Sequence, residues 1–166
     1  WGKQGFFKDG SGKAMEYDDW LRLAEALATL PRKPDIMLWG GEPLTCPDFD
    51  RLARTLYDMG FTLGMVTNGT LLHRHLETAR ECFAQIFVSL DGPEALHDSI
   101  RGQGVFRKVA ENLRLLRGGK AKISINTVLT PALLEDLNGI LRPGDCVLVE
   151  QSTFFPALQT FRSADA

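Results

Sequence analysis

Apolar residues recur at two alternating spacings along the chain, and this alternation predicts helices that are each followed by a short buried strand. Trp20, Leu23 and Leu27 lie at helical spacing, two prolines follow them, and the apolar run 36–39 comes next. The same succession returns four more times. The predicted helices cover about residues 20–30, 47–59, 71–83, 105–116 and 131–141, and the predicted strands cover 36–39, 61–66, 86–90, 122–128 and 146–150.

Successive predicted strands begin about 25 to 35 residues apart, which is the length of a strand–helix–strand crossover unit. Most of them are rich in Ile, Val, Leu and Phe, as expected when both faces of a sheet are covered. The helix boundaries agree, because Gly60 follows the second helix, and Pro47 and Pro131 stand where a first helical turn tolerates proline. We therefore predict an α/β fold with five parallel strands in one domain, 1–166, which begins with a loop over residues 1–15.

Composition and charge are typical of a single globular domain. The 166 residues include 19 basic and 21 acidic side chains, which give a net charge of -2, and 44% of the residues are hydrophobic. A near-neutral balance lacks the extended basic surface that binding to a phosphate backbone needs, so nucleic acid is not an expected partner. No apolar stretch approaches the roughly 20 residues that span a bilayer, so we expect no membrane segment and a soluble protein.

The three cysteines, Cys46, Cys82 and Cys146, are odd in number and widely spaced. They match neither a secreted disulfide framework nor a CxxC metal knuckle, which indicates a reducing, cytoplasmic compartment. The chain also opens at Trp1 without an initiator methionine, so we expect the numbering to describe part of a longer protein.

Small and polar residues follow four successive predicted strands. Ligands of parallel α/β sheets bind at the carboxyl ends of the strands, so these residues are the first candidates for a site. Adjacent glycines let a ligand approach the backbone closely, and the carbonyls and amides there can grip an amino group. Each motif alone is more typical of an ordinary turn, but their coincidence at one sheet edge favours a site. The motifs are Gly40-Gly41-Glu42-Pro43, Thr67-Asn68-Gly69, Ser89-Leu90-Asp91-Gly92-Pro93 and Asn126-Thr127.

Other polar side chains carry weaker signals. The Arg101 guanidinium could fork onto a carboxylate, with a solvated surface arginine as the alternative. His73 and His75 are two apart on a predicted helix, so they face different directions and do not predict a metal pair. His97 beside Asp98 could act as an acid–base pair, although capping of a short helix explains the pair more simply. No Gly-x-Gly-x-x-Gly motif or P-loop follows a strand, so nothing predicts nucleotide-phosphate binding.

Taken in order, the strand-end motifs resemble those of the radical S-adenosylmethionine (radical SAM) superfamily. Residues 40–44 resemble its GGEP motif, and residues 67–70 resemble the TNG turn that follows the next strand. The runs 89–93 and 97–102 resemble the S-x-D-G-P and H-D-x-x-R-G sequences of its peptide-modifying and sulfatase-maturating (SPASM-type) branch. The resemblance covers about residues 36–128 and depends on several ordered motifs.

This resemblance implies a partial (β/α)6 barrel of the TIM type, in which the five predicted strands are the second to the sixth. It also implies a binding site for S-adenosylmethionine at the carboxyl ends of these strands. In that site the backbone of the GGEP loop holds the amino group, Ser89 and Arg101 contact the ribose and the carboxylate, and Asn126 lies near the nucleoside. The expected S-adenosylmethionine-binding residues are Gly40, Gly41, Glu42, Pro43, Thr67, Asn68, Ser89, Arg101 and Asn126.

One part of the family pattern is absent from this sequence. Members of the superfamily hold a four-iron four-sulfur (4Fe-4S) cluster with the three thiolates of a CxxxCxxC motif, which lies in the loop after the first strand. The three cysteines of this chain lack that spacing. We therefore expect that the first strand is missing and that the cluster ligands lie upstream of Trp1. We also expect that no residue of this chain binds the metal and that this chain alone is inactive.

The activity that the resemblance implies is that of an oxidoreductase. Reductive cleavage of S-adenosylmethionine gives a 5′-deoxyadenosyl radical, which abstracts hydrogen from a substrate. A peptide or protein substrate and an electron donor such as flavodoxin or ferredoxin are expected by analogy with the SPASM-type branch. Two alternatives stay open: an inert S-adenosylmethionine-binding or scaffold module that lacks the cluster, and an unrelated barrel enzyme whose glycine turns bind phosphorylated sugars.

Overall fold

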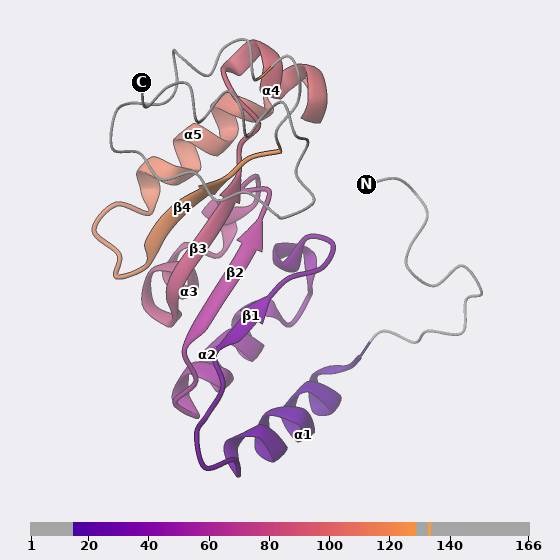
Figure 1. Cartoon of the computed structure of the whole chain (residues 1–166), viewed down its shortest axis with the longest axis vertical. Coiled ribbons are helices and arrows are strands. Elements are labelled where there is room, and N and C mark those ends of the chain that lie inside the picture. Colours follow the sequence, from indigo (N-terminus) through magenta and orange to yellow (C-terminus); the bar gives the residue numbers. More distant parts are fainter. Residues whose placement is uncertain (1–14, 129–132, 134–166) are drawn as a thin grey trace, which may run out of the picture.

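The computed structural model describes residues 15–128 and Leu133, and its centre is a four-stranded parallel sheet (Figure 1). Each strand pairs with its predecessor, so the order across the sheet is the order along the chain. A sequential order is that of a (β/α) barrel segment, whereas a doubly wound sheet reverses its direction once. The strands are β1 (Ile36–Leu38), β2 (Leu63–Thr67), β3 (Phe83–Ser89) and β4 (Lys122–Asn126).

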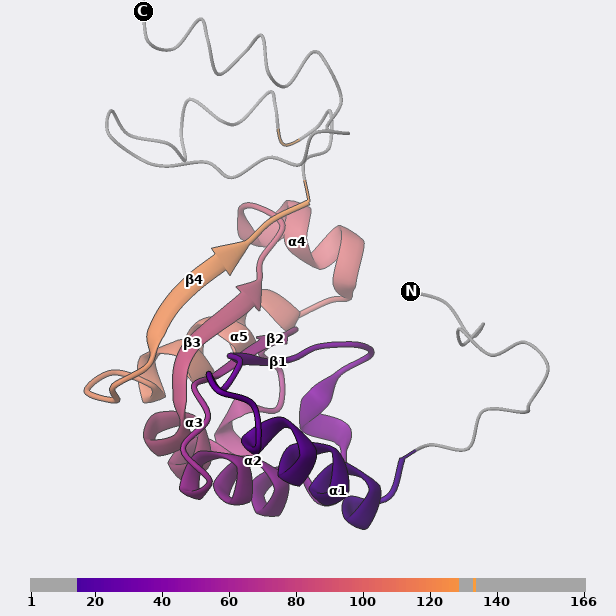
Figure 2. The same cartoon turned by 60° about the horizontal axis from the view of Figure 1, so that its bottom comes forward.

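Helices cover one face of this sheet (Figure 2). Right-handed crossovers that all progress in the same direction place every connecting helix on the same side, which explains the arrangement. One helix, α4, lies past the carboxyl ends of β3 and β4 instead (Figures 1 and 2). The helices are α1 (Tyr17–Ala28), α2 (Phe49–Asp58), α3 (Leu76–Cys82), α4 (Glu94–Arg101) and α5 (Val105–Leu115), with short 3-10 helices η1 (Pro43–Thr45) and η2 (Leu72–Arg74).

The helix-facing side of the sheet forms the hydrophobic core. Met65, Ile86 and Val88 are fully buried on this side, in one apolar cluster with Ala53 of α2 and Val109 of α5. Burying a large apolar side chain of this kind stabilises the fold by about 1.5–3 kcal/mol. The core therefore packs against one face of the sheet only, and the opposite face is not part of this apolar cluster.

The opposite face of the sheet is open and mixed in character. Met37 and Trp39 are 48% and 77% exposed. The Met37 side chain lies over Gly64, where an added Cβ would come within 2.6 Å of the methionine Cε. Farther along the sheet, Gln85 Nε2 donates a hydrogen bond to Ser124 Oγ at 2.7 Å. In a (β/α) barrel this face is the interior.

Two predicted helix boundaries are wrong. The predicted helix 71–83 divides into η2 and α3, and Phe83 is the first residue of β3. Phe83 pairs with Leu63, and its fully buried ring stacks on Phe49 at a centroid distance of 5.9 Å, so tertiary packing determines this boundary. Pro47 lies in a turn rather than in the first helical turn, since α2 begins at Phe49.

The predicted α/β class and parallel sheet are confirmed. The predicted strand 146–150 lies outside the described residues, as do the helix 131–141 apart from Leu133 and the loop 1–15 apart from Met15. Among the helices of the described part, none is long and apolar enough to cross a bilayer.

Candidate functional site

The carboxyl ends of the strands bring the predicted site residues to one edge of the sheet. The register pairs Thr67 with Val88 and Ser89 with Asn126, so β3 and β4 end level with each other and β2 ends one residue earlier. The GGEP loop follows β1 at the same edge, because β1 runs parallel to β2. Since paired residues of neighbouring strands point to the same face, Ser89 and Asn126 share a face of the sheet.

The carboxylate of Glu42 ties the loop after β1 to the loop after β2. One oxygen, Oε1, accepts a hydrogen bond from Thr67 Oγ1 at 2.6 Å and a longer one from the Leu44 amide at 3.3 Å. The other, Oε2, accepts from the Asn68 amide at 2.7 Å. Thr67 Oγ1 in turn accepts from the Gly69 amide at 3.0 Å. We call this set of bonds the Glu42 clasp, and it leaves the carboxylate occupied inside the protein.

The TNG turn after β2 is fixed by local bonds and by close packing. Asn68 Oδ1 accepts from the amide and the hydroxyl of Thr70 at 2.9 and 2.7 Å. Gly69 has a φ of +77°, and an added Cβ would lie 2.9 Å from Val88 Cγ1. Its carbonyl accepts from Asn112 Nδ2 of α5 at 2.8 Å. The side-chain oxygen of Asn68 is therefore engaged within the turn.

The two glycines of the GGEP loop present an open backbone. Gly40 has a φ of +146°, which L side chains rarely adopt, and no heavy atom lies within 4 Å of a Cβ built on Gly40 or on Gly41. A ligand can therefore approach their amides and carbonyls without displacing a neighbouring side chain.

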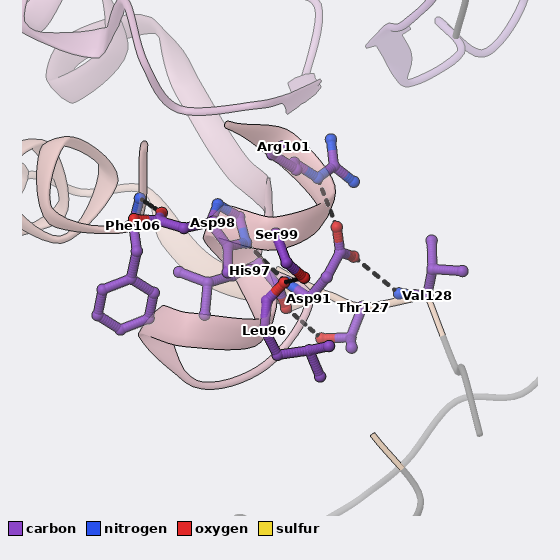
Figure 3. A network of polar contacts seen from close by, with 10 residues as sticks. Asp91, Leu96, His97, Asp98, Ser99, Arg101, Phe106, Thr127 and Val128 are labelled. Carbon is purple, nitrogen blue, oxygen red and sulfur yellow. Dashed lines mark hydrogen bonds and ion pairs between the residues drawn. The ribbon is translucent and has the colours of Figure 1, made fainter. Parts of the chain in front are cut away.

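Asp91 is the centre of a polar network after β3, which Figure 3 shows. The residue is fully buried, and its carboxylate accepts hydrogen bonds from Arg101 Nε and from the Val128 amide. The Asp91 amide donates to His97 Nδ1 at 3.0 Å. Burial opposes ionisation of Asp91, but the bonds from Arg101 and Val128 outweigh burial and lower its pKa. Asp91 is thus a buried anion that holds an arginine.

His97 is a neutral structural acceptor within this network. Its ring is fully buried, and burial lowers its pKa. Nδ1 accepts from the Asp91 amide, so the proton of the neutral ring lies on Nε2, which has no hydrogen-bond partner in the described part of the chain. The ring meets Phe106 edge to face at 6.0 Å.

Asp98 caps a helix rather than forming an acid–base pair with His97. Its two carboxylate oxygens accept from the Phe106 and Gly104 amides at 2.8 and 2.7 Å, at the start of α5. The bond from the Phe106 amide is the main cause of its lowered pKa. The expected local capping of a short helix is wrong in its detail, because Asp98 lies within α4 and its carboxylate instead binds the first amides of the following helix, α5.

His75 supports the GGEP loop from behind. Nδ1 lies 2.9 Å from Asp50 Oδ2 of α2, and Nε2 lies 3.1 Å from the Leu44 carbonyl oxygen. The sequence pattern did not indicate this role, because His75 lies 25 and 31 residues after its partners Asp50 and Leu44. No group of three or more metal-ligating side chains occurs among the described residues.

The described residues do not provide ligands for an iron–sulfur cluster. Cys46 is exposed after η1, whereas Cys82 is buried at the end of α3, where burial raises the pKa of its thiol. A cluster needs several convergent thiolates.

Four groups at this edge have no hydrogen-bond partner within the described part of the chain. They are the Ser89 hydroxyl, the side-chain amide of Asn126, the two terminal nitrogens of Arg101 and the backbone of Gly40-Gly41. An amino acid with an attached nucleoside carries an amino group, a carboxylate and ribose hydroxyls. The donors and acceptors of this edge are chemically suited to these groups.

The fold is a parallel α/β sheet in sequential strand order, consistent with a partial (β/α) barrel, and the candidate site lies at its carboxyl edge. The model of the radical SAM superfamily matches residues 4–142, and the chain belongs to this superfamily. The α/β sheet and the resemblance of the strand-end motifs are in agreement with this assignment.

Curated relatives belong to the same superfamily. The chain is 38% identical over 109 residues to an AdoMet-dependent heme synthase of Methanosarcina barkeri, a match that covers 63% of this chain and 31% of the relative. A heme synthase of the same description from Nitratidesulfovibrio vulgaris is 31% identical over 71% of this chain and 35% of its own length. A GTP 3′,8-cyclase of Synechocystis is 33% identical over 57% of this chain and 30% of its own length. The chain therefore spans about a third of the length of these relatives.

Proposed function

We propose that this chain binds S-adenosylmethionine at the carboxyl edge of its sheet, as part of a radical SAM enzyme. The enzyme would cleave S-adenosylmethionine reductively to a 5′-deoxyadenosyl radical and use the radical to abstract hydrogen from a substrate. The observation that carries the proposal is the Arg101 guanidinium. A buried aspartate holds it by Nε, and its two terminal nitrogens remain available beside the strand ends.

Each group at the edge has a proposed role in binding. The backbone of Gly40-Gly41 accepts the amino group, which its open surroundings support. The terminal nitrogens of Arg101 pair with the carboxylate, since a planar guanidinium matches a carboxylate geometrically. Ser89 and Asn126, level with each other on neighbouring strands, contact the ribose and the nucleoside. Glu42, Thr67 and Asn68 shape the site through the Glu42 clasp.

In the whole protein, the electron for cleavage would come from a reduced iron–sulfur cluster of the kind the superfamily uses, held by residues outside the described part of the chain. The proposal assigns to this chain only the binding and orientation of S-adenosylmethionine and the exclusion of water from it. No acid–base dyad is required, because abstraction by a carbon radical transfers a hydrogen atom rather than a proton. This agrees with the structural roles of His97 and Asp98.

The substrate of the whole protein is a separate question. A peptide or protein substrate and a flavodoxin or ferredoxin donor stay predictions from the motif resemblance. The relatives are named for heme synthesis and for GTP cyclisation, so their names do not support a peptide. Cytoplasmic location likewise stays a prediction.

Anaerobic reconstitution of the full-length protein with iron and sulfide, followed by reduction with dithionite, tests the proposal. We expect 5′-deoxyadenosine and methionine in equal amounts from added S-adenosylmethionine. Binding of S-adenosylmethionine without 5′-deoxyadenosine would favour the inert module. Binding of phosphate esters without binding of S-adenosylmethionine would favour the phosphosugar enzyme and contradict the proposal.

A further inference from the structure

The way in which Arg101 is held distinguishes it from a surface arginine. Its only hydrogen bond in the described part of the chain is from Nε to Asp91 Oδ2, and its side chain is 25% exposed. Because the bond is made through Nε alone, which Figure 3 shows, neither terminal nitrogen has a hydrogen-bond partner in the described part of the chain. The carboxylate therefore fixes the plane of the guanidinium while its outer fork stays available.

Asp91 is itself fixed from three elements. It lies two residues past the end of β3, and its Oδ1 accepts from the Val128 amide, two residues past the end of β4, at 3.1 Å. From α4, His97 Nδ1 accepts from the Asp91 amide. His97 and Arg101 are four residues apart on α4, so one face of this helix meets Asp91 with both side chains. The backbone of Asp91 is thereby held by His97, and its carboxylate is held by Arg101 and by the Val128 amide.

A second arginine–carboxylate pair, between α4 and α5, provides a direct comparison. Arg107 Nε donates to Glu94 Oε1 at 2.7 Å, and these side chains are 76% and 43% exposed. Neither residue of that pair is buried or connected to the strand ends. Exposed pairs of this kind contribute little, because solvent competes for both charges. The Asp91 pair differs in having a fully buried partner at the edge of the site.

From this geometry we infer that Asp91 and His97 are positioning residues, which aim the outer fork of Arg101 at the carboxylate of S-adenosylmethionine. The inference deepens the proposed function and depends on it. Asp91 sets the plane of the guanidinium, and His97 holds the backbone of Asp91. Neither residue touches the ligand, so the two act through Arg101.

Calorimetric titration of the full-length protein with S-adenosylmethionine and with its decarboxylated form tests this inference. We expect the wild-type protein to bind S-adenosylmethionine at least about tenfold more tightly than the decarboxylated form, as a charge-assisted bidentate contact predicts. Asp91→Asn removes the acceptor charge at nearly constant shape. The variant should bind S-adenosylmethionine about tenfold more weakly than the wild type does, while its affinity for the decarboxylated form should be unchanged. Glu94→Gln, in the exposed pair, is the matched control and should keep the wild-type ratio.

Two His97 variants test the second positioning residue. His97→Asn keeps an acceptor at the position of Nδ1 and should preserve the preference for the carboxylate, whereas His97→Leu removes the acceptor and should reduce the preference. These variants also decide the question if Asp91→Asn does not fold.

The outcomes separate the inference from the function. If Asp91→Asn and His97→Leu lowered the affinity for both ligands equally, Asp91 and His97 would have a purely structural role and the inference would be overturned. An unchanged preference in folded Asp91→Asn would also overturn it. Equal affinity of the wild-type protein for both ligands would show that Arg101 does not contact the carboxylate. This result would overturn the inference but not the proposed function. A wild-type protein that binds neither would contradict the proposed function itself.

Discussion

The Glu42 clasp makes a quantitative prediction about the GGEP loop. Glu42→Ala removes the acceptor of the Asn68 amide and of the Thr67 hydroxyl, which lie 2.7 and 2.6 Å from the carboxylate. Each hydrogen bond to a charged group contributes about 1.5–3 kcal/mol when it is shielded from water. Glu42 is half-buried, so water can replace part of the lost hydrogen bonding in the variant and reduce the loss of stability. We therefore expect the free energy of unfolding to fall by about 2–4 kcal/mol.

Glu42→Gln gives a smaller effect that tests the same reasoning. The glutamine amide can turn so that its oxygen accepts from Asn68 and its nitrogen donates to Thr67, so the variant loses mainly the charge and the longer bond from Leu44. The expected loss is about 1 kcal/mol. Urea unfolding of the full-length protein measures both variants, with exposed Glu94→Gln as the control at about 0.5 kcal/mol or less. Equal unfolding curves for Glu42→Ala and the control would refute the clasp.

Further predictions concern the turn after β2 and the network after β3. Gly69→Ala should lower the free energy of unfolding by more than about 1 kcal/mol, since the new Cβ meets Val88 in a left-handed backbone; urea unfolding checks this. His97 has a folded pKa below its ordinary 6.5, so the unfolded state binds more protons as pH falls below that value. Stability should therefore decline below pH 6.5 until the folded pKa is reached, and His97→Asn should abolish that part of the decline in pH-dependent unfolding. Asp98→Ala should speed hydrogen exchange of the Phe106 amide, measured by mass spectrometry, while exchange in α2 stays unchanged.

Much of the fold follows from apolar periodicity. The buried runs around Met65 and Ile86 are short and apolar, and the helices between them show a 3.6-residue period, which together predict a parallel sheet. The boundary at Phe83 was not predictable in this way, because Phe83 is apolar and fits either a helix or a strand. Its stacking on Phe49, 34 positions earlier in the printed sequence, determines the outcome.

The site was predictable in its position but not in its internal connections. Strand-end glycines and polar residues mark the edge of the sheet, and Arg101 stands out as a cation beside it. The occupied state of Glu42 depends on contacts with the next strand's loop, 25 and 26 residues away. The network of Asp91 likewise joins the loop after β3, helix α4 and Val128 beyond β4, and no local pattern in the sequence predicts these contacts.

Titration calorimetry of S-adenosylmethionine into the full-length protein, compared with its Arg101→Gln variant, tests the central claim most directly. The proposed function predicts one bound S-adenosylmethionine per chain and an affinity at least about tenfold lower in the variant, because the variant lacks the guanidinium proposed to pair with the carboxylate. Absence of saturable binding by the wild-type protein, or equal affinities of the two proteins, would contradict the claim.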